Sequence, residues 1–369
     1  MSFHATLDAL SRARGPLLVS IYLPLHVGEA GRREDPLRLR ALLDEARDHA
    51  LEEGHDVRAI ARVLAPGERL LKEDSVWQGG GRGLALFLGV EPFRMHRGQD
   101  PYEPFAIAKT RFALRPLLRS CDGEGRWFVL AFSRNAARLV DCQADHAREI
   151  PLGVDLAAFG GLAERAPLSV HSGGQASRYH GQADDANASK AELIRALRAV
   201  DEAVSRVTAQ DDAPLFVAAV GFEARAYREL SRHPGLQEAI LEGSPDGVDA
   251  RRLRDATEAF AVEVFRAKQR DAIRRVLAQP RRANYETGAI LAAAHAGRVA
   301  TLLVREEPPL WGRFDPVAVS TVVRSHRAPA DDDLLDLAVA LVLSTGGEVH
   351  AVDSDALPGN SPMAALLRF

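Results

Sequence analysis

The feature that most constrains the fold is a pair of apolar strands separated by a long helical segment. Residues 126–133 and 214–220 are short and almost wholly apolar, as strands buried on both faces are. Residues 137–142 and 146–151 follow the first strand as a hairpin partner and a third strand. Residues 187–207 then carry apolar side chains at helical spacing. This strand–helix–strand order predicts a mixed α/β sheet in the middle of the chain.

The segment before this unit predicts a second, smaller α/β arrangement. We expect a strand, a charged and turn-rich segment, two amphipathic helices and two more strands. They fall at residues 17–24, 28–36, 37–53, 57–72, 84–90 and 105–108, in that order.

The segment after residue 220 predicts helices at 222–232 and 235–241, and then a long charged helix at 249–277. Pro280 ends the long helix. A compact α/β/α unit of about one hundred residues should close the chain. The apolar face of the long helix is expected to hold Leu253, Ala256, Phe260, Val264 and Ala267. The closing unit should contain two helices, at 284–296 and 334–344, and the first of them should end at Gly297. Its strands are expected at 299–304, 316–323, 349–352 and 364–369.

Composition excludes several classes of protein. The formal net charge of the 369 residues is −4, which argues against a basic, non-specific nucleic-acid coat protein. Only two cysteines, Cys121 and Cys142, are present, so we expect a reducing compartment and no disulfide framework. The start has no signal-peptide pattern, and the longest apolar runs are too short to span a bilayer. The expectation is a cytoplasmic protein with no membrane partner.

Residues 171–182 form the stretch whose residue types most clearly suit catalysis or binding. They read His-Ser-Gly-Gly-Gln-Ala-Ser-Arg-Tyr-His-Gly-Gln, with no hydrophobic period, so we expect a polar loop before the helix. Gly173 and Gly174 would let the backbone approach another molecule closely. Gln175 carries a neutral amide that can orient a water molecule beside a developing oxyanion. Such a tip suits a loop that enters an RNA cavity and hydrolyses an ester.

Two other interpretations of this stretch stay open. The Gly-Gly-Gln tripeptide can arise by chance in a surface loop. Alternatively, His171, His180, Asp184 and Asp185 could bind a metal in a hydrolase, although their spacing matches no recognised ligand pattern. The two aspartates also suit a helix N-terminus, where acidic side chains are favourable. We therefore predict no metal and no cofactor.

A second candidate surface is an arginine cluster at the end of the long helix and beyond Pro280. Cations at a helix C-terminus are favourable in themselves, and arginine also binds phosphate well. The sequence supports both roles equally. The residues concerned are Arg270, Arg274, Arg275, Arg281 and Arg282.

The order of several short motifs resembles the bacterial relatives of the archaeal and eukaryotic class I peptide chain release factors and of Pelota. The resemblance spans nearly the whole chain. Its pieces are Ser-Ile-Tyr-Leu-Pro at 20–24, Arg-Leu-Arg-Ala-Leu-Leu at 38–43, Gly-Leu-Ala-Leu-Phe at 83–87, Arg-Trp-Phe-Val-Leu at 126–130, Tyr-His-Gly-Gln at 179–182 with Lys190, Gly-Gly-Glu-Val at 346–349 and Leu-Leu-Arg-Phe at 366–369.

The resemblance implies three domains: a decoding-domain counterpart at 1–123, a ribonuclease-H-like sheet with the catalytic loop at 124–265, and an α/β/α domain like the kink-turn RNA-binding ribosomal proteins at 266–369. It also implies a ribosome-associated factor that binds rRNA and tRNA near the A site of stalled or idle ribosomes. A translational GTPase would be a further partner. The residues expected to meet RNA are His171, Arg178, His180, Gly181, Lys190 and the five arginines of the cluster.

Two departures from the family pattern limit what the resemblance implies. The chain lacks the Asn-Ile-Lys-Ser motif of decoding domains, so we expect no stop-codon reading. In release factors a His-Gly pair stands just before Gly-Gly-Gln, whereas His180-Gly181 lies after Gln175 here. Ester hydrolysis of peptidyl-tRNA and non-catalytic occupancy of the ribosome, for dormancy or rescue, therefore both stay open.

Overall fold

The two ends of the chain build one compact unit and its middle builds another. Unit 1 consists of Met1–Glu124 and Phe265–Phe369, and unit 2 of Gly125–Val264. The computed structural model describes residues 3–26, 28–77, 81–90, 93–98, 100–118, 125–133, 136–143, 146–154, 156, 179–209, 213–306, 308–328 and 331–369. For residues 3–5, 29–32, 179–190 and 354 it describes the backbone alone.

The first sheet of unit 1 is antiparallel, with strand order β3-β2-β1-β4. Its strands are β1 (Leu18–Pro24), β2 (Gly83–Leu88), β3 (Arg94–Gly98) and β4 (Phe105–Lys109). Helices α2 (Glu29–Glu52) and α3 (Val57–Leu70) contribute Leu39, Leu43 and Leu64 to a core on one face of this sheet. The opposite face contributes Tyr22 and Phe87 to a second core.

Helix α2 begins well before the expected start, and the predicted turn-rich segment at 28–36 was wrong. Pro36 lies inside the helix, where proline normally removes a hydrogen bond. The buried carboxylate of Asp35 anchors this part of the helix. It accepts the N–H of His26 at 2.8 Å and pairs with Arg38 at 2.9 Å. These bonds fix the first turns of α2 to the end of β1, which local sequence preferences alone do not reveal.

The second sheet of unit 1 has the order β10-β16-β11-β15. Strand β11 pairs in parallel with β15 and antiparallel with β16. Helix α8 ends as expected at a glycine, since Gly297 has a φ of +67°. The strands are β10 (Ala283–Asn284), β11 (Val299–Arg305), β15 (Glu348–Val352) and β16 (Met363–Leu367), and the helices are α8 (Thr287–His295) and α9 (Leu334–Ser344). A smaller sheet holds β12 (Trp311–Asp315), β13 (Ser320–Val323) and β14 (Asp332–Asp333).

One continuous core joins the two ends of the chain within unit 1. Tyr22, Phe87 and Phe112 lie in the same buried cluster as Leu302 and Leu334. Helix α1 (Phe3–Arg12) adds Leu7 and Leu10 to this cluster. The first and third of the expected domains thus share their apolar interior.

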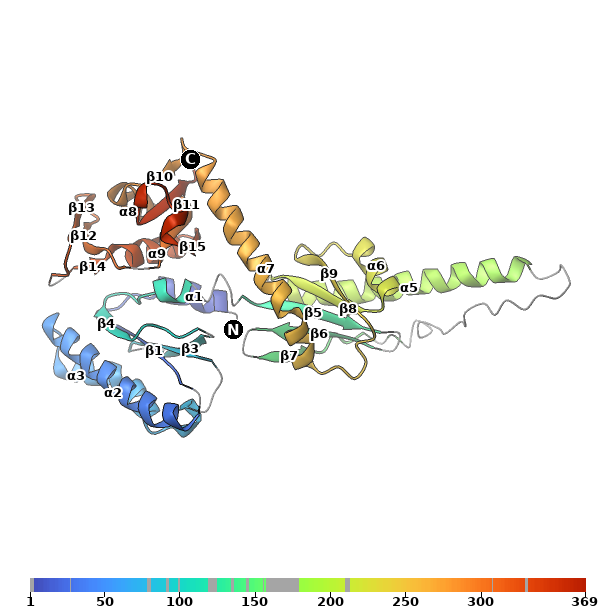
Figure 1. Ribbon diagram of the computed structural model, residues 1–369, viewed down its shortest axis with the longest axis horizontal. Coiled ribbons are helices and arrows are strands. Elements are labelled where there is room, and N and C mark those ends of the chain that lie inside the picture. Colours follow the sequence, from blue (N-terminus) through green and yellow to red (C-terminus); the bar gives the residue numbers. More distant parts are fainter. Residues whose placement is uncertain are drawn as a thin grey trace. The chain divides into compact units, whose positions relative to one another are not determined.

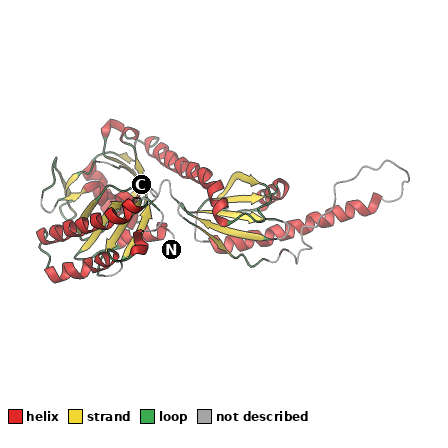
Figure 2. Ribbon diagram, turned by 60° about the horizontal axis from the view of Figure 1, so that its bottom comes forward, coloured by secondary structure: helices red, strands yellow, loops and turns green. Residues whose placement is uncertain are grey.

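Unit 2 contains a five-stranded sheet of order β7-β6-β5-β8-β9. Strands β5, β6 and β7 are antiparallel neighbours, whereas β8 and β9 pair in parallel, which is the arrangement of a ribonuclease-H-like sheet. Figures 1 and 2 show its strands flanked by helices. The strands are β5 (Trp127–Phe132), β6 (Ala137–Cys142), β7 (Ala147–Ile150), β8 (Leu215–Ala219) and β9 (Leu236–Glu242), and the helices are α5 (Tyr179–Thr208), α6 (Gly221–Leu230) and the start of α7 (Ala250–Leu277).

Alternate residues of β5 face the two helical layers of unit 2. Phe128, Leu130 and Phe132 pack with α5 and α6. Trp127 instead donates its indole N–H to the hydroxyl of Thr257 on α7, at 2.9 Å. Burial on both faces explains why β5 reads as an apolar run.

Three expectations about unit 2 and α7 were wrong. The segment expected as a helix at 235–241 is strand β9, because pairing with β8 overrides its local preference. Helix α5 begins at Tyr179 instead of residue 187, so His180 and Gly181 belong to a helix and not to a loop. The expected apolar face of α7 is shifted: Phe260 is 45% exposed, while Thr257 and Ala261 are fully buried.

The expected class, a mixed α/β protein with several sheets, is confirmed. In the part of the chain that the structure describes, no helix combines the length and apolar character needed to cross a membrane.

Candidate functional site

Helix α5 begins four residues after the Gly-Gly-Gln stretch in the sequence. Gly173, Gly174 and Gln175 lie outside the described residues, as do His171 and Arg178. His180, Gly181 and Lys190 lie on α5, but their side chains are outside the described part of the structure. The tripeptide therefore stands a few residues before the N-terminus of a 30-residue helix. An N-terminus of this kind favours nearby negative charge, such as phosphate.

The C-terminal part of α5 is firmly held in unit 2. Leu193, Leu197, Val200 and Val204 lie in the core against the sheet. Asp201 adds a polar tie, since it accepts the hydroxyl of Tyr227 on α6 at 2.9 Å.

The N-terminal part of α5 runs on past the strands, as Figure 1 shows. Residues 179–192 precede Leu193, which is the first of the described side chains of α5 to lie in the core of unit 2. At 1.5 Å per residue this part of the helix is about 20 Å long. The N-terminus of α5 therefore lies well beyond the part of the helix that is packed in the core of unit 2.

The arginine cluster forms the second candidate surface, and α7 and the chain after it carry it in unit 1. Arg274 pairs with Asp271 one turn away, and Arg275 pairs with Glu348 of β15 at 2.7 Å. A groove beside them is lined by Lys268, Asp271, Arg274, Arg275, Ala278, Gln279 and Glu348. Both paired arginines stay accessible, with side chains 75% and 51% exposed.

The arginines expected to act together have different environments. Arg282 donates to the backbone carbonyl of Leu367 at 3.0 Å and so ties the end of β16. Arg270 and Arg281 are exposed. Glu348 places a strong negative charge in the groove: a hydrogen bond from His350, aided by Arg275, lowers its pKa to about 2. The groove is therefore less basic than the sequence suggests.

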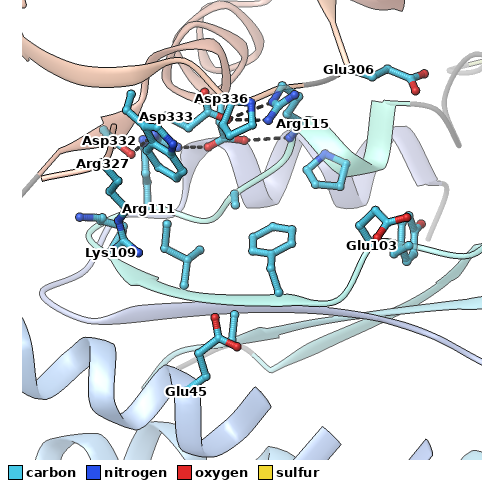
Figure 3. A pocket seen from close by; sticks show the side chains of 18 of the residues that line it. Glu45, Glu103, Lys109, Arg111, Arg115, Glu306, Arg327, Asp332, Asp333 and Asp336 are labelled. Atoms are coloured by element: carbon cyan, nitrogen blue, oxygen red, sulfur yellow. Dashed lines mark hydrogen bonds and ion pairs between the residues drawn. The ribbon is translucent and has the colours of Figure 1, made fainter. Parts of the chain in front are cut away.

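A cavity of about 730 Å³ in unit 1 was not anticipated from the sequence (Figure 3). Its walls come from β4, from the connector after β4, and from the segments around β12 and the start of α9. A buried ion-pair cluster, defined as Arg111, Arg115, Asp332, Asp333 and Asp336, forms one side.

The ion-pair cluster joins the first and last parts of unit 1. Arg111 pairs with Asp336 and, at 2.8 Å, with Asp332. Arg115 pairs with Asp333 at 2.7 Å. Asp336 also accepts the backbone N–H groups of Leu114 and Arg115, at 2.6 and 2.8 Å. The carboxylate of Asp336 is thus surrounded by donors, as a buried charge requires.

Burial changes the protonation equilibria of this cluster. Desolvation by itself would lower the pKa of Arg111, but the charges of Asp336 and Asp332 raise it above its ordinary value. Desolvation raises the pKa of Asp333, and the nearby charge of Arg115 opposes that change. The one sequence signal was the run of aspartates before an apolar helix, in which Asp333 caps α9 by accepting the N–H of Leu335. Nothing in the sequence pointed to the partner Arg111.

Among the described side chains there is no group of three or more histidine, cysteine, aspartate or glutamate residues that could hold a metal. The considered ligands His171, His180, Asp184 and Asp185 lie outside those side chains. Cys142 is buried, and burial raises the pKa of its thiol to about 12, so it is not a reactive thiolate.

Taken together, the elements define a multi-domain α/β protein whose central ribonuclease-H-like sheet carries a long helix behind a Gly-Gly-Gln stretch. The central part of the chain is similar to the bacterial relatives of the archaeal and eukaryotic release factors, as the sequence predicted. Residues 126–298 match the family model described as bacterial archaeo-eukaryotic release factor family 3. The comparison with curated proteins gave no match.

Solved structures of low identity are also similar. The archaeal Pelota in a model of ribosome-bound Pelota and ABCE1 is 12% identical, with a TM-score of 0.40, over 100% of this chain and 94% of that one. Dom34 of S. cerevisiae, a translation termination-like factor that interacts with Hbs1, is 13% identical, with a TM-score of 0.40, over 76% and 74%. The archaeal translation termination factor aRF1 is 14% identical, with a TM-score of 0.25, over 99% and 96%.

Proposed function

We propose that this protein is a ribosome-associated translation factor that binds rRNA and tRNA near the A site of stalled or idle ribosomes. The family match over residues 126–298 is the observation that carries the proposal, because it covers most of unit 2, including α5. The groove beside Arg274 and Arg275 supports it, since both guanidinium groups are accessible to phosphate. A translational GTPase remains a proposed partner, and the cytoplasm the proposed compartment.

In this proposal the first encounter is electrostatic and is made through two separate surfaces. One is the N-terminal end of α5 with His180, Gly181 and Lys190 near it, preceded by His171 and Arg178. The other is the arginine cluster in unit 1. Binding through phosphates releases counterions, so affinity should fall steeply as salt rises.

The proposed chemistry is hydrolysis of the ester that links a nascent peptide to tRNA. Gly173 and Gly174 would let the backbone enter the site, and the amide of Gln175 would orient the attacking water. The protein contributes positioning, and the surrounding RNA takes part in the proton transfer. Non-catalytic occupancy of the ribosome is the alternative, favoured by the position of His180-Gly181 within α5 and after Gln175.

Co-sedimentation of the purified protein with ribosomes, with and without nascent chains and at two salt concentrations, tests the association. Binding that weakens with salt supports the proposal. If the protein fails to sediment with ribosomes in every state, ribosome association is wrong.

A peptide-release assay on loaded ribosomes then separates the two alternatives. Gln175→Ala should abolish release and leave co-sedimentation unchanged. Gln182→Ala is the matched control, because it removes the amide of the second Gly-Gln pair, which lies in α5. Release that survives Gln175→Ala, or that depends on Gln182, would exclude the assigned role of Gln175.

A further inference from the structure

The cavity of unit 1 has a negative rim that the ion-pair cluster does not neutralise. Glu45, Glu103, Glu306 and Asp353 line it in addition to the three aspartates of that cluster. Within the described part of the chain, the side chains of Glu45, Glu103 and Asp353 make no hydrogen bond or ion pair. All three are exposed. Carboxylates in this state attract a cation without first having to release another one.

The lining cations are already engaged. Arg111 and Arg115 belong to the ion-pair cluster, and Lys109 pairs with Glu53 at 2.8 Å. The guanidinium of Arg327 lies over the ring of Trp311, 5.5 Å from its centroid. Seven carboxylates and four cations line the cavity in the described part of the chain, so it presents a net negative charge to a ligand.

The walls of the cavity are apolar and aromatic. Phe105 and Ile107 of β4 are partly exposed, as is Trp311 of β12. A volume of about 730 Å³ falls within the range of cavities that hold a drug-sized ligand. A ligand with apolar side chains next to its positive charges would bury these walls.

The outer edge of β4 adds the main-chain hydrogen-bonding groups of Ala106, while the N–H of Ala108 on the same edge is already bonded to His49. Among the strands that the structure describes, β4 lies at the edge of its sheet and pairs with β1 alone. The N–H of Ala108 points away from β1, since it donates to Nδ1 of His49 at 3.2 Å. Alternation along an antiparallel pair places the N–H and C=O of Ala106 on that same outer edge, and Ala106 lines the cavity. An extended chain can pair with such an edge.

We propose that this cavity binds an extended basic peptide segment of a partner protein, with its backbone along β4 and its lysine or arginine side chains on the acidic rim. The rim carboxylates come from different elements: α2, the segment before β4, and the segments after β11 and β15. Figure 3 shows Glu45, Glu103 and Glu306 on different sides of the cavity. One metal ion or small cation cannot meet charges so placed, whereas a peptide with several cations can.

The test uses the full chain and a fluorescein-labelled peptide of alternating lysine and valine, followed by fluorescence anisotropy without ribosomes. Glu45→Gln, Glu103→Gln and Asp353→Asn should each weaken binding about two- to fivefold, as expected for exposed ion pairs. Glu73→Gln is the matched control, because Glu73 is an exposed carboxylate near α3 that does not line the cavity. Its affinity should equal that of the unchanged protein.

Two changes to the peptide complete the test. Methylation of alternate backbone nitrogens should weaken binding at least tenfold, since it removes pairing with β4, and a glutamate–valine peptide should not bind. The proposal is overturned if the lysine–valine peptide does not bind, if Glu73→Gln weakens it as much as the rim variants do, or if methylation has no effect. These outcomes do not depend on ribosome association.

Discussion

At the scale of single residues, Asp336 carries a buried charge that depends on several partners in unit 1. Its carboxylate is 6% exposed and meets Arg111 together with the N–H groups of Leu114 and Arg115. Removing one partner of a buried pair leaves the other charge without compensation, which costs more than the pair contributes when intact.

Asp336→Ala should therefore lower the free energy of unfolding by about 3–5 kcal/mol. Urea unfolding measures the loss, and hydrogen exchange in α9 assigns it to unit 1. Asp271→Ala is the control, because it also removes the aspartate of a helical Asp–Arg pair, but one that is 61% exposed. That change should cost less than about 1 kcal/mol. Equal losses in the two variants would contradict a special role for Asp336.

His49 gives unit 1 a defined response to acid. Its Nδ1 accepts the N–H of Ala108, so the ring must be neutral at that nitrogen. Burial lowers the pKa of His49, aided by the charges of Arg327 and Lys109, while Glu53 and Glu52 oppose the shift.

Because the folded pKa lies below the unfolded value of about 6.5, the unfolded chain binds more protons between the two. The stability contributed by neutral His49 should thus be present above about pH 6.5 and be lost as the pH falls toward the folded pKa. His49→Gln keeps an acceptor but cannot titrate. The drop in urea midpoint between pH 7.5 and pH 5.5 should be smaller in this variant. An unchanged drop would assign the acid sensitivity to other groups.

Individual site residues could be predicted from the sequence only where a short stretch contains a recognisable motif or a cluster of one residue type. Gly-Gly-Gln at 173–175 and the arginines at 270–282 stood out by composition. Asp336 and Arg111 did not, because their pairing joins positions 225 residues apart. A buried ion pair leaves no local pattern in the chain.

At the scale of elements, the arginine cluster on α7 has a clear test. Arg274→Glu with Arg275→Glu should weaken ribosome binding steeply. The slope of log K against log salt should become shallower by roughly 0.7–0.9 for each phosphate that the variant no longer binds. Glu348→Gln should act in the opposite direction, since it releases Arg275. Co-sedimentation across a salt series measures both.

Arg232→Glu provides the matched charge reversal, because Arg232 is exposed and lies in unit 2. Its binding should change little. If the double variant binds ribosomes as well as the unchanged protein does, the cluster is not a phosphate-binding surface.

Most strands and helices with a strong period were predictable, and the exceptions have physical causes. Strand β9 reads as helix-forming because it contains Gln237 and Glu238, and its pairing with β8 overrides that local preference. Strand β3 was missed because Arg94 and Arg97 make a charged edge strand look like a loop. On α7, the sequence pattern placed Ala256 and Phe260 on the buried face. The buried face in fact contains Leu253, Thr257 and Ala261. Because Thr257 has a hydroxyl, a search for apolar residues at helical spacing does not identify it as buried.

At the scale of the whole molecule, the division into two units predicts how fragments behave. Residues 125–264 contain a complete sheet with its own core and should fold alone. Residues 1–124 should not, because Tyr22, Phe87 and Phe112 share their core with Leu302 and Leu334.

Circular dichroism and denaturant titration of each fragment check this expectation. The 125–264 fragment should unfold cooperatively, the 1–124 fragment should associate or stay unfolded, and co-expression with 265–369 should restore it. A monomeric 1–124 fragment that unfolds cooperatively would support the three-domain division at 1–123, 124–265 and 266–369 as a division into independent folding units.

The shared core of unit 1 also sets an order of events during synthesis. Residues 1–124 leave the ribosome first, yet their apolar face packs against residues as late as Met363 and Ala365 on β16. Unit 2 can fold in the interval, because all its strands are already available. The first part of the chain must wait, with Tyr22 and Phe87 uncovered, until the last strand is made. A nascent chain of this protein that stalls before β16 therefore leaves an unfinished core, which quality-control systems can recognise by its exposed apolar surface.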